Sequence, residues 1–391
     1  MNLKLIFISL GLLLTELLTA QDQTTELSLK QVIEIARMES PDAQTARHSF
    51  RSAYWNYKYY RANYLPSLSL TSDPNLNRAI NKITMGDGSV KFVEQNLLNT
   101  DLTLNLSQNL SWTGGSFFLE TSAQRMDLFS EHKYSWQTSP IMIGYRQSLF
   151  GYNSLKWDRR IEPVRYQEAK KSYVETLELV SANAINKFFA LATAQSDYDI
   201  ASFNYANADT LYRYAQGRYN IGTITENEML QLELNRLTEE TNRMNALIEM
   251  DNCMQELRSY LGIHEDRELR VLVSPQIPDF SVNLNEALAL AYENSPDIQT
   301  MERRKLESES AVAKARANAG LKADIYLRFG LTQTADKLPE AYRNLLDQQY
   351  VSIGISLPIL DWGRGKGQVR VARSNRDLVD PMFSKQQNHH H

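Results

Sequence analysis

The chain has 391 residues, of which 42% are hydrophobic, with a mean hydropathy of −0.44 and a formal net charge of −4. The low hydropathy excludes a protein built mainly of membrane-spanning helices. The acidic balance argues against a nucleic-acid partner, because phosphate binding needs a basic surplus. The single cysteine, Cys253, excludes an intrachain disulfide and a cysteine metal cluster.

The N-terminus predicts export. Residues 1–20 are organised as a secretory signal peptide: Lys4 supplies the positive region, Leu5 to Leu18 the apolar region, and Leu18-Thr19-Ala20 the cleavage site. This apolar run is too short and too interrupted for a spanning helix, and no later segment has 18 consecutive apolar residues. An exported chain of this kind is periplasmic, secreted, or a β-barrel protein of the outer membrane.

Two segments of the chain repeat one another. Leu29 to Thr45 reads LKQVIEIARMESPDAQT, and Leu284 to Thr300 reads LNEALALAYENSPDIQT, an ungapped match at an offset of 255 residues. The shared motif predicts an internal duplication. The first repeat would cover residues 21–261, and a second, incomplete repeat would cover residues 283–373.

The two copies also share local signals for helix start and interruption. A capping box precedes each helix, Ser28-x-x-Gln31 in the first copy and Asn283-x-x-Glu286 in the second. Pro41 and Pro296 are each expected to kink or restart the helix, because proline cannot supply the intrahelical N–H.

Each repeat is predicted to run from helix into strand. Alternating apolar and polar residues predict strands at about residues 66–72 and 142–150 in the first repeat and at about 323–332 and 350–360 in the second. The first repeat has about 45 extra residues between its strands, and about residues 101–124 of this insert form a further predicted hairpin. This hairpin either lengthens an outside loop or adds strands to the sheet. Two-faced strands of this length fit a transmembrane barrel wall.

Aromatic residues gather where the predicted strands meet helices. They form either a girdle at a membrane interface or ordinary packing at a helix–sheet junction. The residues are Tyr57, Tyr59, Tyr60, Tyr64, Phe150, Tyr152, Trp157 and Trp362.

Residues 163–261 are predicted to form a long helical hairpin. Fifty uninterrupted helical residues before the turn would span about 75 Å, which requires a coiled coil or another extended assembly. Gly222 suits a helix end that needs φ > 0, and Thr225-x-x-Glu228 is a capping box that restarts the chain as a helix. The returning helix has apolar residues at heptad spacing, which predicts an antiparallel coiled coil. This heptad seam consists of Leu230, Leu234, Leu237, Met244 and Ile248.

The remaining segments are a linker and a tail. Residues 262–282 are predicted to be a linker with a short strand-like stretch. Residues 374–391 are predicted to be an irregular C-terminal tail, because Asp380-Pro381 breaks the helical pattern.

No catalytic, cofactor-binding or metal site is predicted, so the chain is not expected to be an enzyme. The histidines His48, His132 and His264 have no metal-ligand spacing. Gly363 to Gly367 lacks the spacing of a phosphate loop and is predicted to turn the chain from strand to helix. His389 to His391 could bind a metal weakly, but a terminal tag remnant or a random tail is the preferred interpretation.

The order of these elements resembles the TolC-like outer-membrane efflux proteins. The resemblance rests on the duplicated helix–Ser-Pro-Asp–helix unit, on the strand entry Tyr64-Leu65-Pro66-Ser67-Leu68, and on the turn Arg218-Tyr219-x-x-Gly222-x-Ile224. It covers nearly all of the chain between Leu27 and about Arg373.

The resemblance implies a fold that is mainly α with β, in which long antiparallel coiled-coil helices form a periplasmic α-barrel. In that family a homotrimer shares one transmembrane β-barrel, and each protomer gives four strands. The helix tips dock a periplasmic adaptor, which is itself bound to an inner-membrane pump. The chain would then be a passive exit duct of a tripartite efflux or type I secretion system, in the outer membrane of a Gram-negative bacterium. Arg218, Gly222, Thr223 and Ile224 would lie at the docking tip.

One departure from the family pattern and one alternative accompany this interpretation. The second repeat should continue into its own hairpin of about 100 residues, but the sequence ends 24 residues after Gly367. The sequence would then be a truncated or frameshifted family member, or a fragment, and is expected to leave the α-barrel incomplete and the duct impaired. The alternative is a periplasmic adaptor, which also combines a coiled-coil hairpin with β-structure, although the duplication favours the channel.

Overall fold

The computed structural model describes residues 25–264, 268–274, 276 and 281–389, so the predicted signal peptide lies outside the described residues. The chain forms two compact units. One contains Met1–Arg51 and Lys170–Ser295, and the other contains Ser52–Ala169 and Pro296–His391. Among the described residues, no helix combines the length and the apolar character that a membrane crossing requires.

The first unit is helical, with one small sheet. It contains α2 (Leu29–Glu39), the start of α3 (Pro41–Ala62), most of α4 (Ser154–Asn220), α5 (Glu226–Leu261) and α6 (Leu284–Asn294). The strands β1 (Thr25–Ser28) and β7 (Leu269–Leu272) pair in parallel. The core lies where α2, the start of α3, α4, α5 and the two strands meet, and its buried side chains include Val32, Phe188, Leu191, Leu257 and Val271.

The predicted helix starts and proline breaks are present. Ser28 and Gln31 form the capping box of α2. Ser40 and Ser295, which precede the two prolines, are both extended, with ψ of 147° and 136°. This follows from the steric clash of a proline ring with the preceding residue. Asn283 also caps its helix, but its side chain accepts from the N–H of Asn285, so the predicted box with Glu286 is wrong in this detail.

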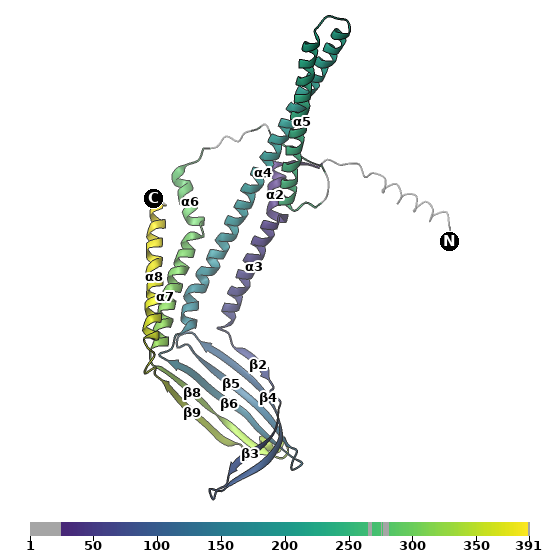
Figure 1. The fold of residues 1–391 in the computed structure, drawn as a ribbon. Helices are drawn as coiled ribbons and strands as arrows, with labels where there is room; N and C mark the ends of the chain where they lie inside the picture. The colour runs from purple at the N-terminus through teal and green to yellow at the C-terminus, as the bar shows by residue number, and fades with distance from the viewer. Residues whose placement is uncertain (1–24, 265–267, 275, 277–280, 390–391) are drawn as a thin grey trace, which may run out of the picture. The chain divides into compact units, whose positions relative to one another are not determined.

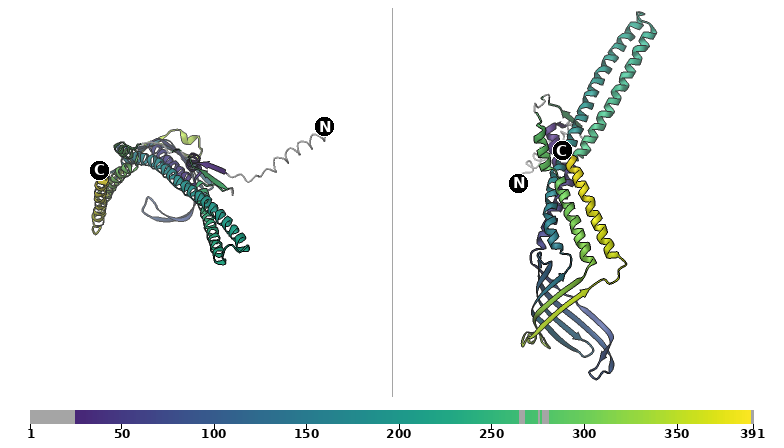
Figure 2. Two further views of the ribbon diagram at one scale, coloured as in Figure 1. Left: turned by 90° about the horizontal axis from the view of Figure 1, so that it is seen from above. Right: turned by 90° about the vertical axis from the view of Figure 1, so that its left-hand side faces the viewer.

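The helical hairpin is longer at its start than predicted. Asn153 accepts a hydrogen bond from the N–H of Lys156 and caps α4, so the helix begins at Ser154 and Pro163 lies inside it. Figures 1 and 2 show α4 and α5 side by side.

The predicted heptad seam of α5 does not face α4. Its five apolar members are all exposed, Leu234 to 65%. A different face of α5 packs on α4: Leu257 and Leu261 are buried in the core, and Arg236 and Arg243 lie over the rings of Tyr212 and Tyr205. The prediction was wrong because α5 has two apolar faces, and heptad spacing cannot tell which one meets α4.

The second unit is built on one sheet of β2 (Ser67–Thr71), β3 (Asn75–Thr84), β4 (Val90–Leu110), β5 (Gly115–Leu128), β6 (Lys133–Leu149), β8 (Lys322–Ala335) and β9 (Leu346–Ser356). The order is β2-β4-β5-β6-β8-β9, every neighbouring pair is antiparallel, and β3 also pairs with β4. Figure 1 shows these strands as one layer. The extra hairpin therefore adds strands to the sheet.

Strands β2 and β3 act as one edge strand. Thr71 pairs with Thr103 and Asn75 pairs with Asn99, so four positions pass on each strand and the register is unchanged. The interruption between them contains Pro74, which cannot donate to the ladder and is tolerated at a sheet edge. The sequence did not predict β3 or the first part of β4.

The second repeat differs from its prediction at two places. Strand β9 ends at Ser356, shortly before Pro358, and not at residue 360. Residues 374–389 of the predicted irregular tail are instead part of α8 (Arg364–His389), which lies beside α7 (Asp297–Ala319) in Figure 2, and the last two residues lie outside the described residues. Pro381 lies inside this helix and does not end it, contrary to the expectation from the sequence.

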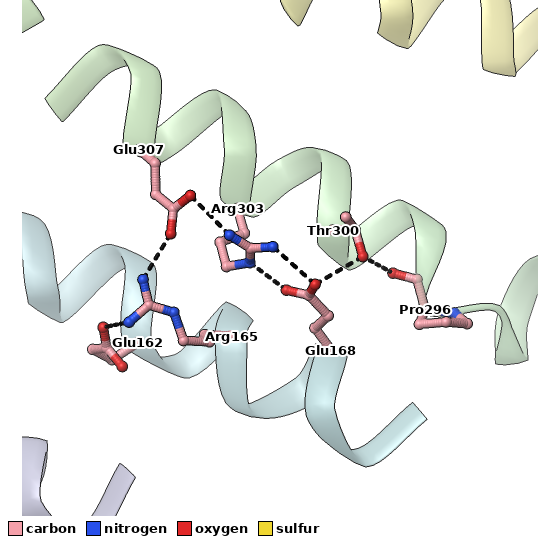
Figure 3. Close-up of polar contacts among 7 residues, drawn as sticks. All are labelled: Glu162, Arg165, Glu168, Pro296, Thr300, Arg303 and Glu307. Carbon is pink, nitrogen blue, oxygen red and sulfur yellow. Dashed lines mark hydrogen bonds and ion pairs between the residues drawn. The ribbon is translucent and has the colours of Figure 1, made fainter. Parts of the chain in front are cut away.

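A network of charged residues joins α4 to α7 within this unit (Figure 3). Both guanidinium ends of Arg303 bond to carboxylates: Nε and Nη2 to Glu168, the latter at 3.0 Å, and Nη1 to Glu307 at 2.8 Å. Arg165 bonds to Glu307 at 2.7 Å and to Glu162. Burial alone would raise the pKa of Glu168, but the hydrogen bonds from Arg303 and Thr300 outweigh burial and lower it.

We expect Glu168→Gln to destabilise the protein by roughly 1.5–3 kcal/mol at neutral pH, the range for hydrogen bonds to charged groups. The folded-state pKa of Glu168 lies below its unfolded value, so its charge stabilises the fold at neutral pH. This contribution is lost as the pH falls from the unfolded value through the lower folded one. Thermal unfolding of the detergent-solubilised variant and wild type should therefore converge in acid. Glu256→Gln, which removes an ion pair on an exposed carboxylate, is the control and should change little.

Gly144 in β6 lies directly beneath the ring of Phe118 in β5, and a Cβ there would come within 2.0 Å of that ring. We expect Gly144→Ala to cost about 1–3 kcal/mol, as overpacking does. At Gly354 in β9 a Cβ would meet no heavy atom within 4 Å, so Gly354→Ala is the matched control. Equal unfolding midpoints for the two variants would contradict this account of the packing.

Candidate functional site

The sheet of the second unit has one apolar and one polar face. Opposite residues along the ladders share a face, so the register places the apolar side chains of six strands on the same side. They are Leu68 and Leu70 in β2, Leu102, Leu104 and Leu106 in β4, Phe117 and Leu119 in β5, Ile141 and Ile143 in β6, Ile325, Leu327 and Phe329 in β8, and Val351, Ile353 and Ile355 in β9.

Most of this apolar face is open. Ile353 is 64% exposed and Leu68 is 66% exposed, and no described helix covers them. A contiguous exposed apolar surface of this extent marks an interaction with a membrane or another protein. Alternation of apolar and polar residues along each strand is the arrangement of a wall between lipid and water.

The polar face carries charged and aromatic side chains. Arg328 donates to Glu120 at 2.9 Å, and the guanidinium of Arg146 lies 5.5 Å from the centre of the Tyr326 ring. Tyr326 also stacks on Phe118, with ring centres 5.9 Å apart. The face opposite the apolar band is therefore suited to water.

The aromatic residues near the strand ends divide into two groups. Tyr57 stacks on Tyr166 at 4.5 Å, and the hydroxyl of Tyr64 donates to the carbonyl of Leu155 at 2.7 Å. These tyrosines pack at the helix–sheet junction, one of the two alternatives considered above. Phe150 and Trp362 are instead exposed, Trp362 to 90%, and remain available as interfacial residues.

The turn of the helical hairpin, in the first unit, is held by its own backbone. Gly222 has φ of 76°, and its N–H donates to the carbonyl of Tyr219, while the N–H of Thr223 donates to that of Arg218. This pair of bonds is a Schellman motif with Gly222 at C′, as predicted. Thr225 and Glu228 then form the predicted capping box of α5.

The four residues expected at the tip have two different roles in this geometry. Gly222 and Thr223 make the turn. Arg218 and Ile224 instead line a shallow groove on the hairpin, together with Leu211, Tyr214, Ala215, Glu228, Gln231 and Leu232. The sequence did not point to Ile221, which is 74% exposed and is the most exposed apolar residue of the turn. An apolar residue inside a turn between two helix caps was the available signal.

The described residues contain no group of three or more histidine, cysteine or carboxylate side chains that could hold a metal ion. The segment 363–367 turns the chain into α8, as predicted. Asp361 accepts hydrogen bonds from the N–H groups of Gly365 and Gly363, which lower the pKa of its carboxyl.

Comparisons with known proteins agree with this geometry. A family model described as outer membrane efflux protein matches residues 32–263, more than half of the chain. The multidrug resistance outer membrane protein MdtQ of Escherichia coli O6:H1 is 21% identical over 369 residues, which cover 92% of this chain and 75% of MdtQ.

Solved structures show the same fold. The CmeC outer membrane channel of Campylobacter jejuni has a TM-score of 0.64 and 16% identity, over 92% of this chain and 67% of CmeC. The outer membrane protein VceC of Vibrio cholerae has a TM-score of 0.60 and 14% identity, over 92% of this chain and 75% of VceC.

These relatives are outer-membrane proteins, and the matched family is one of efflux channels rather than enzymes. The match also decides against the periplasmic adaptor, the alternative left open by the sequence. The chain therefore belongs to the outer membrane efflux protein family and is a protein of the outer membrane.

Proposed function

We propose that this chain is the outer-membrane channel subunit of a tripartite efflux or type I secretion system and works as a homotrimer. The observation that carries the proposal is the two-faced sheet with two free edges. Among the described strands, β2 and β9 each pair on one side only. In lipid an open edge would leave backbone N–H and C=O groups without partners, so the sheet must close with further copies.

The helices support assembly in the same way. One apolar face of α5 packs on α4, and the second, formed by the heptad seam defined above, is exposed. A helix with two apolar faces needs a neighbour on each side, as in the wall of an α-barrel. In the assembled protein this seam would pack on a helix of another copy, leaving polar faces toward the duct and the periplasm.

The helical tip is the proposed contact with a periplasmic adaptor, and through it with an inner-membrane pump. The groove beside Arg218 and Ile224 combines apolar side chains with a basic and an acidic residue, and Ile221 projects next to it. A hairpin of a partner helix pair fits such a surface, because apolar groove residues bury its apolar face while the charges set its register. The channel itself is passive and carries out no chemistry.

The two faces of the sheet predict that an arginine is tolerated at one of two adjacent residues and not at the other. Val351 lies on the apolar face of β9 and Ser352 on the polar face. An arginine at the lipid-facing position costs about 2–4 kcal/mol near the bilayer midplane. We expect Val351→Arg to abolish heat-modifiable oligomers in the outer-membrane fraction, whereas Ser352→Arg should retain them. Failure of both variants, or of neither, would contradict the proposed faces.

The docking tip can be tested in the bacterium that makes this protein. A photo-crosslinking amino acid at Ile224 should give an adduct that mass spectrometry identifies as an adaptor carrying a helical hairpin. The same amino acid at Phe203, an exposed apolar position on α4 farther from the turn, is the matched control and should give no adaptor adduct. Adducts with a different class of protein at Ile224, or equal adaptor adducts at both positions, would overturn the docking assignment.

A further inference from the structure

We propose that each copy of this chain contributes six strands to the membrane wall, so that three copies close a barrel of eighteen strands. This inference rests on the proposed trimeric channel. The family resemblance implies four strands for each protomer, so the proposed wall has two more strands for each copy. Its consequence is a membrane pore about half again as wide.

Strands β4 and β5 are continuous with the rest of the wall. Strand β4 pairs with β5 over fourteen consecutive positions, from Leu97–Leu128 to Leu110–Gly115, and β5 continues the ladder to β6. Both strands keep the alternation of their neighbours, with leucines and phenylalanine on the apolar face and Asn105, Ser107 and Glu120 on the polar face. An outside loop would have no reason to present a lipid-compatible face in register with the rest of the sheet.

The β4–β5 turn is fixed at the helix end of the sheet. The amide of Gln108 donates to the carbonyl of Tyr64, and the amide of Asn109 donates to that of Asn63, at the end of α3. The amide of Asn153, just before α4, donates to the carbonyl of Ser111. These bonds tie the inserted hairpin to the points where the chain enters and leaves the sheet.

The directions of the two edge strands allow the ring to close. Five antiparallel steps separate β2 from β9, so these edge strands run in opposite directions. Strand β9 of one copy can therefore pair antiparallel with β2 of the next, and alternation continues around a ring. Strands 4.8 Å apart and tilted by about 40° give a backbone diameter of about 36 Å for eighteen strands, against about 24 Å for twelve.

Deletion of residues 90–131 provides a matched variant. It joins Ser89 to His132 and removes β4 and β5, so that the edge strand of residues 67–84 meets β6 (Lys133–Leu149), a strand of similar length. Native mass spectrometry and negative-stain microscopy should show trimers of both proteins. The membrane ring of the full chain should be about 1.5 times as wide as that of the variant.

The outcomes separate this inference from the proposed function. Equal ring diameters would overturn the six-strand wall, whereas a full-length dimer, which closes at twelve strands, would overturn the barrel of eighteen strands. The absence of any oligomer of the full chain in the outer membrane would overturn the trimeric channel itself.

A cysteine test applies if the deletion variant does not fold. In a Cys253→Ser background, Ser69→Cys in β2 and Ser352→Cys in β9 should oxidise to a covalent trimer, because these edge strands of neighbouring copies meet when the ring closes. Ser69→Cys with Ser148→Cys in β6 is the control. These two strands are adjacent only if the hairpin lies outside the wall, so an intrachain disulfide in that pair would overturn the inference.

Discussion

The requirement that backbone hydrogen bonds be completed in lipid governs this structure. In the sheet, β4, β5, β6 and β8 have a partner on each side, whereas β2 and β9 have one among the described strands. A membrane offers no water to the free N–H and C=O groups of these edges. The apolar face across all six strands makes the bilayer the natural surroundings of the sheet, so the edges must find their partners in other copies. This constraint is the reason that we propose an oligomer and count its strands.

In the first unit, exposed apolar side chains rather than backbone groups need a neighbour. Helix α5 buries one apolar face against α4 and leaves the other exposed. Exposed leucines at heptad spacing are costly in water, at about 25 cal/mol per Å² of apolar surface. A wall of helices that each have two neighbours removes this cost. The chain therefore carries two kinds of surface that need a neighbour: the edges of the sheet in the second unit and the exposed apolar face of α5 in the first. Assembly with further copies explains both.

Polar contacts between residues far apart in the sequence hold the elements of the second unit together. The Glu168–Arg303 pair joins residues 135 positions apart in the sequence, and the amides of Gln108 and Asn109 bind the hairpin turn to the end of α3. The Glu168–Arg303 and Gln108–Tyr64 contacts satisfy groups that would otherwise be left partly buried without partners, which makes them specific as well as stabilising. Side-chain amides of the additional hairpin thus tie it to the backbone at the end of α3, which lies beside it only in the folded chain.

The sequence by itself determined the features that depend on residues a few positions apart. These are the caps at Ser28 and Thr225, the extended residues before Pro41 and Pro296, the Schellman turn at Gly222 and the alternation along the strands. At the tip, it placed the turn but could not show that Arg218 and Ile224 share a groove with Leu211 and Glu228, which lie on both helices. Spacing also predicted an apolar seam on α5 without deciding which of its two faces meets α4.

Only the tertiary structure decided the order of the strands, the single register of β2 and β3, and the place of the inserted hairpin in the sheet. It also revealed that α8 continues where the sequence suggested an irregular tail. The physical reason is common to these cases. Period and capping are properties of one segment, whereas pairing and burial depend on which distant segment becomes the neighbour.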